Sequence, residues 1–273
     1  ILGGSSPPKI GVSQAIVLRG LAVTGSTYLS VAYSIPSVVA RVPAMTNAAP
    51  VLDLSYTTSG APPTTTTTTT TIPANGIVVD AIGDGGPDAA HWNSPLAARL
   101  RADKPAAFLW AGDVRNTGTV TEWHLYDANY GQLKPITLPT PGNHDWGLAK
   151  SGYNVEFASG APWADTKTYC NAVTLANGWK LFSINTYTLS ACLPTLTSWL
   201  RATPGTKKIV LTHQPRYSGA NPTAAAQAKI WNAMVGHAFA LFTGHDHDTQ
   251  VIERDGLVQV VDGCAGAAYY PVT

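Results

Sequence analysis

The sequence predicts an α/β domain over residues 76–273, preceded by a small β-rich module. After residue 76, short apolar runs typical of strands alternate with helical stretches. Several of these runs end in Gly followed by Asp, Asn or His. Before residue 60, strand patterns occur without a good helical segment. Since loops after the carboxyl ends of strands carry the functional groups of α/β domains, we expect the site in these loops.

The amino-acid composition argues against a nucleic-acid-binding or membrane-spanning protein. Of the 273 residues, 45% are hydrophobic and only 12% are charged, and the formal net charge is +1. A net charge this small gives no strong electrostatic attraction for nucleic acid or an anionic membrane. No apolar run approaches the roughly 20 residues that span a bilayer. Low charge with many Thr, Ser, Ala and Gly indicates a secreted or extracellular protein. The chain opens with Ile-Leu-Gly-Gly and no Met, so we expect a removed leader or a fragment.

We predict three domains along the chain. Residues 1–60 form a β-rich module, with expected strands at 16–18, 27–35, 38–42 and 51–56. It is a sandwich-like unit or an assembly arm whose strands a neighbour completes, which allows self-association. Residues 61–75 form a Pro/Thr-rich linker, in which the unbroken run Thr64–Thr71 is a candidate for O-glycosylation. Residues 76–273 form the main domain.

Three cysteines are present. Cys170 and Cys192 flank an expected strand at 179–184 and could pair across it, although the sequence does not show that they come within bridging range. Cys264 is expected to be a small buried apolar residue. No Cys-x-x-Cys occurs, which disfavours a thiolate zinc site.

The main domain alternates strands and helices. The expected helices are 94–102, 196–201 and 224–235, with Ser94 as the N-cap of the first and Pro95 at its first position. The expected strands are 77–82, 106–111, 135–140, 179–184, 208–212, 239–242, 251–252 and 257–261.

A set of polar side chains recurs at the ends of these strands. Each has an ordinary interpretation alone, because Gly-Asp and Gly-Asn are common turns. Together they supply carboxylate, amide and imidazole donors, which suit first-row divalent metals. The set is Asp84, Asp113, Asn143, His144, His213, His245 and His247.

The order Gly-Asp-x-Gly, Gly-Asp, Gly-Asn-His-Asp, a strand-end His and Gly-His-x-His resembles the calcineurin-like metallophosphoesterases. It looks closest to their purple acid phosphatase branch. The resemblance covers about residues 76–273 and implies a two-sheet α/β/β/α sandwich with a dinuclear metal site. Two divalent ions about 3.5–4 Å apart can activate water and hold a phosphoryl group.

The resemblance also implies a role for each residue. Asp84 and His247 would bind the first metal, Asp113 would bridge both metals, Asn143, His213 and His245 would bind the second, and His144 would face the leaving oxygen of the substrate as a proton donor. Asp145 and Asp246 are candidates to orient the metal-binding imidazoles.

Two positions depart from the family pattern. Purple acid phosphatases carry a tyrosine three residues after the bridging Asp, and this chain has Asn116 there. Many other relatives carry a histidine two residues after the first Asp, and this chain has Gly86 there. The first metal thus lacks a usual ligand unless Asn116 or water replaces it. We therefore expect Zn, Mn or ferrous iron rather than a purple ferric centre.

Two arginines beside the expected ligands have two interpretations. Arg115 and Arg216 could contact the phosphate of a substrate, or they could be surface ion-pair partners.

The sequence supports two functional hypotheses. The first is a secreted dinuclear phosphoesterase that hydrolyses a phosphate mono- or diester. The second is a structural subunit of an extracellular assembly or filament, which keeps the phosphatase fold with weak or no activity.

Overall fold

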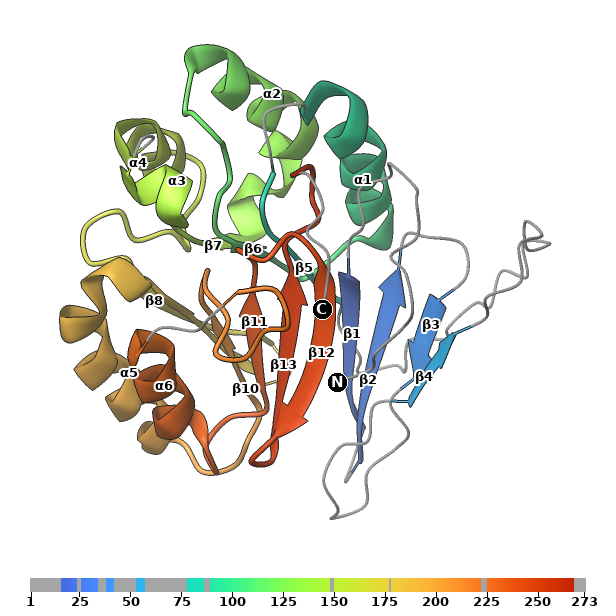
Figure 1. Ribbon diagram of the computed structural model, residues 1–273, viewed down its shortest axis with the longest axis vertical. Helices are drawn as coiled ribbons and strands as arrows, with labels where there is room; N and C mark the ends of the chain where they lie inside the picture. The colour runs from blue at the N-terminus through green and yellow to red at the C-terminus, as the bar shows by residue number, and fades with distance from the viewer. Residues whose placement is uncertain are drawn as a thin grey trace.

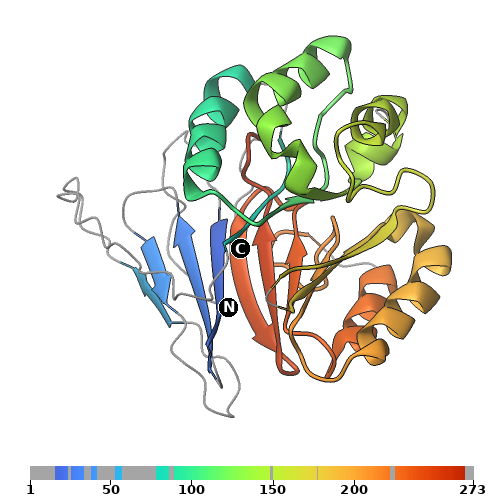
Figure 2. The same ribbon diagram turned by 180° about the vertical axis from the view of Figure 1, so that it is seen from behind.

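The computed structural model describes residues 16–23, 26–33, 38–41, 53–56, 78–85, 89–147, 150–176, 178–221 and 225–267 (Figure 1). The predicted linker 61–75 and Gly86 lie outside the described residues. The protein contains two β-sheets with helices on their outer faces, and Figure 2 shows the same arrangement from behind.

The first sheet has the strand order β4-β3-β2-β1-β5-β6-β7. Strands β5, β6 and β7 run parallel, and β1 pairs antiparallel with β5. The bounds are β1 Ile16–Val23, β2 Ser26–Tyr33, β3 Val38–Arg41, β4 Asp53–Tyr56, β5 Val79–Ile82, β6 Ala107–Ala111 and β7 Thr137–Thr140.

The second sheet has the order β12-β13-β11-β10-β9-β8. Its four inner strands run parallel, while β8 and β12 are antiparallel edges. The bounds are β8 Cys170–Thr174, β9 Lys180–Ile184, β10 Lys208–Leu211, β11 Ala240–Thr243, β12 Thr249–Arg254 and β13 Leu257–Asp262.

Neighbouring side chains along the buried strands point to opposite faces of the sheet, so each strand contributes to two hydrophobic clusters. In β6, Leu109 joins a cluster shared with the second sheet, whereas Phe108 and Trp110 join a cluster under the helices. This period of two is expected for a strand covered on both faces. Helices α1, α2 and α4 cover the first sheet, and α5 and α6 cover the second (Figure 1). The predicted α/β/β/α sandwich is confirmed.

The helices are α1 Ala89–Asp103, α2 Val120–Tyr130, α3 Asn143–Gly147, α4 Lys150–Ala158, α5 Leu189–Ala202 and α6 Ala225–Met234, with short 3-10 turns η1 Gly131–Ile136 and η2 Thr186–Thr188. The predicted start of the first helix was wrong. Ser94 and Pro95 lie inside α1, which begins at Ala89. A proline within a helix removes one backbone hydrogen bond, and here it does not end the helix.

The N-terminal strands continue the first sheet. β1 pairs with β5 in the register Ile16↔Ala81 and Leu18↔Val79, and β2, β3 and β4 follow outward. The prediction of strands in this region is therefore confirmed. The division into three domains stays a prediction.

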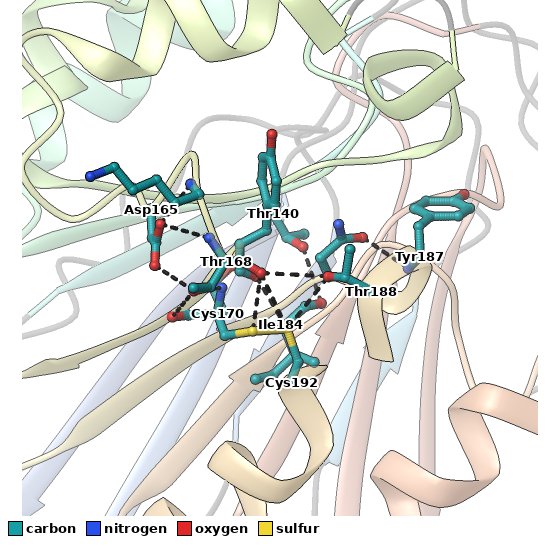
Figure 3. Close-up of a disulfide and its surroundings, with 12 residues drawn as sticks. Thr140, Asp165, Thr168, Cys170, Ile184, Tyr187, Thr188 and Cys192 are labelled. Carbon is teal, nitrogen blue, oxygen red and sulfur yellow. Dashed lines mark hydrogen bonds between the residues drawn. A yellow bond between two sulfur atoms is a disulfide. The ribbon is translucent and has the colours of Figure 1, made fainter. Parts of the chain in front are cut away.

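A disulfide joins the start of β8 to α5 (Figure 3). Cys170 and Cys192 have Cα atoms 5.6 Å apart, within the ordinary bridging range. Cys264 is a free thiol and is buried, as predicted. Within the described part of the chain, no helix is long and apolar enough to span a membrane.

Candidate metal centre

The predicted site residues come from both sheets. Asp84 follows β5, Asp113 follows β6, and Asn143 opens α3 shortly after β7. His213 and His245 follow β10 and β11 of the second sheet. Because these five strands are parallel within their sheets, their carboxyl ends present the side chains at one edge of the sandwich.

Strained backbone holds three of these residues. Asp84, Asp113 and His245 have positive φ angles of 59°, 46° and 70°, which side chains other than glycine rarely adopt. The carboxylate of Asp113 also lies close to the backbone of Gly142, where it would overlap an added Cβ. Such strain persists where the surrounding structure fixes a functional geometry.

Asp84 is a buried carboxylate in which one oxygen accepts a hydrogen bond and the other has no hydrogen-bond partner among the described residues. Its Oδ2 accepts a 2.7 Å hydrogen bond from the backbone amide of His245. Its Oδ1 is buried and has no hydrogen-bond partner among the described residues, with Nε2 of His247 3.5 Å away. A buried carboxylate oxygen without a donor favours a cation as its partner.

Asp113 lies between two histidines. Oδ1 accepts a 2.8 Å hydrogen bond from the amide of His144, and Oδ2 is 3.4 Å from Nε2 of His213. Burial alone would raise the pKa of Asp113, but the neighbouring His213 and the contacts with His144 lower it below its usual value. Asp113 is therefore held as an anion.

Asn143 connects the two sheets. Its Oδ1 lies 3.0 Å from Nε2 of His213 and 3.0 Å from Nδ1 of His245. The two imidazole nitrogens are 3.2 Å apart. Three donor atoms from distant parts of the sequence thus converge on one point.

His213 is fully buried and has a defined orientation. Its Nδ1 lies 2.8 Å from the carbonyl oxygen of Ala111, which can accept a hydrogen bond from Nδ1–H and leave Nε2 directed at Asp113. Burial would lower the pKa of His213, but the charge of Asp113 and its hydrogen bonds raise it to about 10. A metal binding at Nε2 would therefore displace a proton.

His144 lies at the margin of the cluster. Its Nδ1 is 2.9 Å from the backbone carbonyl of Asn116, and its Nε2 is 3.9 Å from Oδ2 of Asp113. The side chain is 35% exposed, whereas His213 is fully buried. His144 is thus the histidine of the cluster that a solvent molecule or substrate reaches most easily.

Two predicted orienting residues have other partners. Asp145 is fully buried and accepts hydrogen bonds from the backbone amides of Gly142 at 2.9 Å and Val114 at 3.1 Å. Asp246 accepts from Ser218 and Asn221. The contacts described for these carboxylates tie loops together, and a backbone carbonyl contacts His213. That the two carboxylates orient imidazoles stays a prediction.

The predicted arginines lie in different surroundings. Arg115 is fully buried, and its guanidinium carbon lies 5.5 Å from the centroid of the Tyr126 ring. A substrate contact would require the guanidinium to leave this environment. Arg216 is half-buried and lies 4.6 Å from the ring centroid of Tyr217.

The donor set fits a divalent metal. Ligand atoms of Asp84, Asp113 and His213 lie within 4.8 Å of one another, and all three residues are buried. Oδ1 of Asp84 adds a buried oxygen that has no hydrogen-bond donor among the described residues. Oxygen and imidazole donors of this kind suit Zn, Mn or Fe.

Sequence reasoning missed the loop-connecting role of Asp145 and the position of Tyr187. Tyr187 stacks on Trp146, with ring centroids 6.0 Å apart and an interplanar angle of 10°. Trp146 belongs to α3, the helix that also carries Asn143 and His144. No motif around Tyr187 signals this position, because it depends on how β9 and α3 pack.

The chain is similar to several solved structures. The GAP50 anchor of the inner membrane complex of Plasmodium matches with a TM-score of 0.57 and 17% identity, covering 68% of this chain and 71% of that chain. TT1561 of Thermus thermophilus matches with a TM-score of 0.48 and 13% identity, covering 68% and 89%. A novel archaeal phosphodiesterase matches with a TM-score of 0.37 and 14% identity, covering 68% and 84%.

None of the curated proteins matches the chain significantly. The calcineurin-like phosphoesterase family matches it over residues 82–249, which spans the loops of all the predicted metal ligands. The chain therefore belongs to the calcineurin-like phosphoesterase family.

Proposed function

We propose that this protein is a dinuclear metal-dependent phosphoesterase that hydrolyses a phosphate mono- or diester. The observation that carries the proposal is the meeting of Asn143 with His213 and His245 at 3.0 Å each, beside Asp113 and Asp84. Carboxylates, an amide and imidazoles from separate strands converge at one place. Burial of apolar surface does not explain why these polar groups meet. Membership of the calcineurin-like phosphoesterase family supports hydrolysis of a phosphate ester as the chemistry of this group of residues.

The proposed ligands divide between two metals. Asp84 and His247 would hold the first metal, Asp113 would be shared by both, and Asn143, His213 and His245 would hold the second. Two divalent ions supply Lewis acidity and lower the pKa of a bound water. Zn, Mn and Fe are the candidates. Asn116 replaces the tyrosine of the purple acid phosphatase branch, so assignment to that branch stays a prediction.

His144 is the proposed proton donor to the leaving oxygen. The carbonyl of Asn116 can accept from Nδ1, which leaves Nε2 directed towards Asp113 at the exposed margin of the cluster. A departing alkoxide needs a proton, and a positioned imidazole transfers one efficiently near neutral pH. Arg216 remains a proposed phosphate contact.

We further propose that the protein is secreted. The disulfide between Cys170 and Cys192 supports this, since disulfides persist mainly in oxidising compartments. The alternative function, a structural subunit that associates through residues 1–60, has support from the fold of the GAP50 protein, which is named as an anchor. A polymer in sedimentation would favour that alternative, and a monomer would favour a plain enzyme.

Hydrolysis of p-nitrophenyl phosphate and bis(p-nitrophenyl) phosphate tests the proposed function. We expect the chain loaded with Mn or Zn to hydrolyse at least one of the two, and His144→Ala to lower kcat by about 10²–10⁴-fold while the bound metal is unchanged. His124→Ala is the matched control, because His124 is exposed on α2 outside the cluster. Equal rates for both variants would contradict the role of His144.

A further inference from the structure

Tyr187 is fixed beside the metal-binding loops by contacts from two elements. Its backbone amide donates a 2.9 Å hydrogen bond to Oδ1 of Asn185, the residue after β9 (Figure 3). Its ring stacks on Trp146 of α3. Since α3 also carries Asn143 and His144, the ring of Tyr187 is placed by the same helix as two of the proposed site residues.

The hydroxyl of Tyr187 is buried and has no hydrogen-bond partner among the described residues. The neighbouring Tyr169, which also packs on Trp146, differs in this respect: its hydroxyl donates a 2.8 Å hydrogen bond to Asn154. A buried hydroxyl without a partner is unfavourable compared with a phenyl ring of the same shape. The described residues therefore supply no hydrogen-bond partner for the Tyr187 hydroxyl.

The carboxylates of the cluster act on this hydroxyl through their charges. Burial first, and then the charges of Asp113, Asp145 and Asp84, raise the pKa of Tyr187 well above its ordinary value. The hydroxyl is thus a neutral donor at physiological pH. The Tyr187 ring stacks on Trp146 of α3, so one helix positions both this ring and the proposed site residues Asn143 and His144.

We propose that the Tyr187 hydroxyl donates a hydrogen bond to a phosphoryl oxygen of the bound ester or of the phosphate product. This inference rests on the proposed function. An anionic oxygen accepts a hydrogen bond more strongly than a neutral group does, and a phosphoryl group brings several such oxygens. The free hydroxyl, the fixed ring and the cluster beside it all fit such a ligand.

Tyr187→Phe and Tyr169→Phe form a matched pair for the test. Both remove one hydroxyl from the aromatic group around Trp146, but only the hydroxyl of Tyr187 has no hydrogen-bond partner among the described residues. We would measure binding of inorganic phosphate to the Mn-loaded full chain by calorimetry, and KM and kcat for p-nitrophenyl phosphate. Binding of Mn and urea unfolding of the metal-free protein would be measured separately.

For Tyr187→Phe we expect phosphate binding weakened by roughly 10–100-fold, with Mn affinity unchanged and the metal-free protein as stable as wild type. Tyr169→Phe should keep phosphate affinity within about twofold and lower the unfolding midpoint, because it loses a hydrogen bond within the fold.

Four results would overturn the inference. Equal phosphate affinity for wild type and Tyr187→Phe would remove the role in binding, and a loss of Mn affinity would make the residue part of the metal site instead. Destabilisation of the metal-free protein by Tyr187→Phe would mean that the hydroxyl has a partner within the fold. If the Mn-loaded wild type binds no phosphate and hydrolyses no ester, the proposed function itself fails, and the inference fails with it.

Discussion

The backbone amide of His245 donates a 2.7 Å hydrogen bond to Oδ2 of Asp84, across 161 residues of the chain. Both residues have positive φ angles, 70° for His245 and 59° for Asp84. The loop that carries one proposed metal ligand thereby fixes the carboxylate of another. The two sheets consequently meet at the site through main-chain contacts as well as through side chains.

Gly244 lies directly at this contact. An added Cβ would overlap Oδ2 of Asp84 and press on the backbone carbonyl of Ala111. We expect Gly244→Ala to push the carboxylate aside, to destabilise the protein by about 1–3 kcal/mol and to weaken metal binding. Urea unfolding and metal analysis would measure the two effects. Gly147→Ala is the control, because nothing lies within 4 Å of a Cβ at that position. Full metal binding by Gly244→Ala would contradict this geometry.

Asp145 should be a major contributor to the rigidity of the site. Its buried carboxylate accepts from the amides of Gly142 and Val114, on the loops after β7 and β6. Asp145→Ala leaves these buried N–H groups without an acceptor, so we expect a loss of about 2–4 kcal/mol in the free energy of unfolding. Asp127→Ala, at an exposed position on α2, should change it by less than about 1 kcal/mol. Similar losses for both variants would show that Asp145 has no special role.

The stability of the metal-free protein should fall as the pH rises. Asp113 and its hydrogen bonds outweigh burial and raise the pKa of His213 from 6.5 to about 10. The stabilising contribution of protonated His213 is therefore fully present below pH 6.5 and is lost as the pH rises towards 10. Urea unfolding across that range, with chelator present, would measure the slope, and His213→Asn should flatten it. A slope that is identical in this variant would refute the assignment.

The disulfide should contribute substantially to stability. Cys170 and Cys192 are separated by 22 residues, and closing a loop of that length stabilises a protein by about 3 kcal/mol in the chain-entropy account. The comparison is best made in a Cys264→Ala background, where only this pair can oxidise. Denaturant unfolding with and without reductant should differ by about that amount. No difference would mean that the pair does not form in solution.

Much of the fold was predictable because it depends on local patterns. The apolar runs that became β5, β6, β10 and β13 are short, bounded by turn residues and buried on both faces, so composition alone reveals them. The polar residues of the site follow these strands directly. Their convergence follows from the parallel arrangement, and the contacts of Asn143 with His213 and His245 are a consequence of it.

Other features depend on tertiary packing that no local pattern encodes. The guanidinium of Arg115 packs over Tyr126 in the interior, although its position beside Asp113 predicted either a phosphate contact or a surface ion pair. Asp145 follows His144 directly in the sequence, and its contacts with the backbone amides of Gly142 and Val114 are not signalled by that position. Tyr187 meets Trp146 only because α3 and the turn after β9 pack together.

The central claim is that the cluster around Asp113 holds two metals. Metal content per chain, measured on protein purified without chelators, tests it most directly. We predict about two equivalents of Zn, Mn or Fe, with Asp113→Asn losing most of both because this carboxylate is shared. One equivalent or none, unchanged after addition of Zn or Mn, would contradict the dinuclear site and leave a phosphoesterase fold without its proposed chemistry.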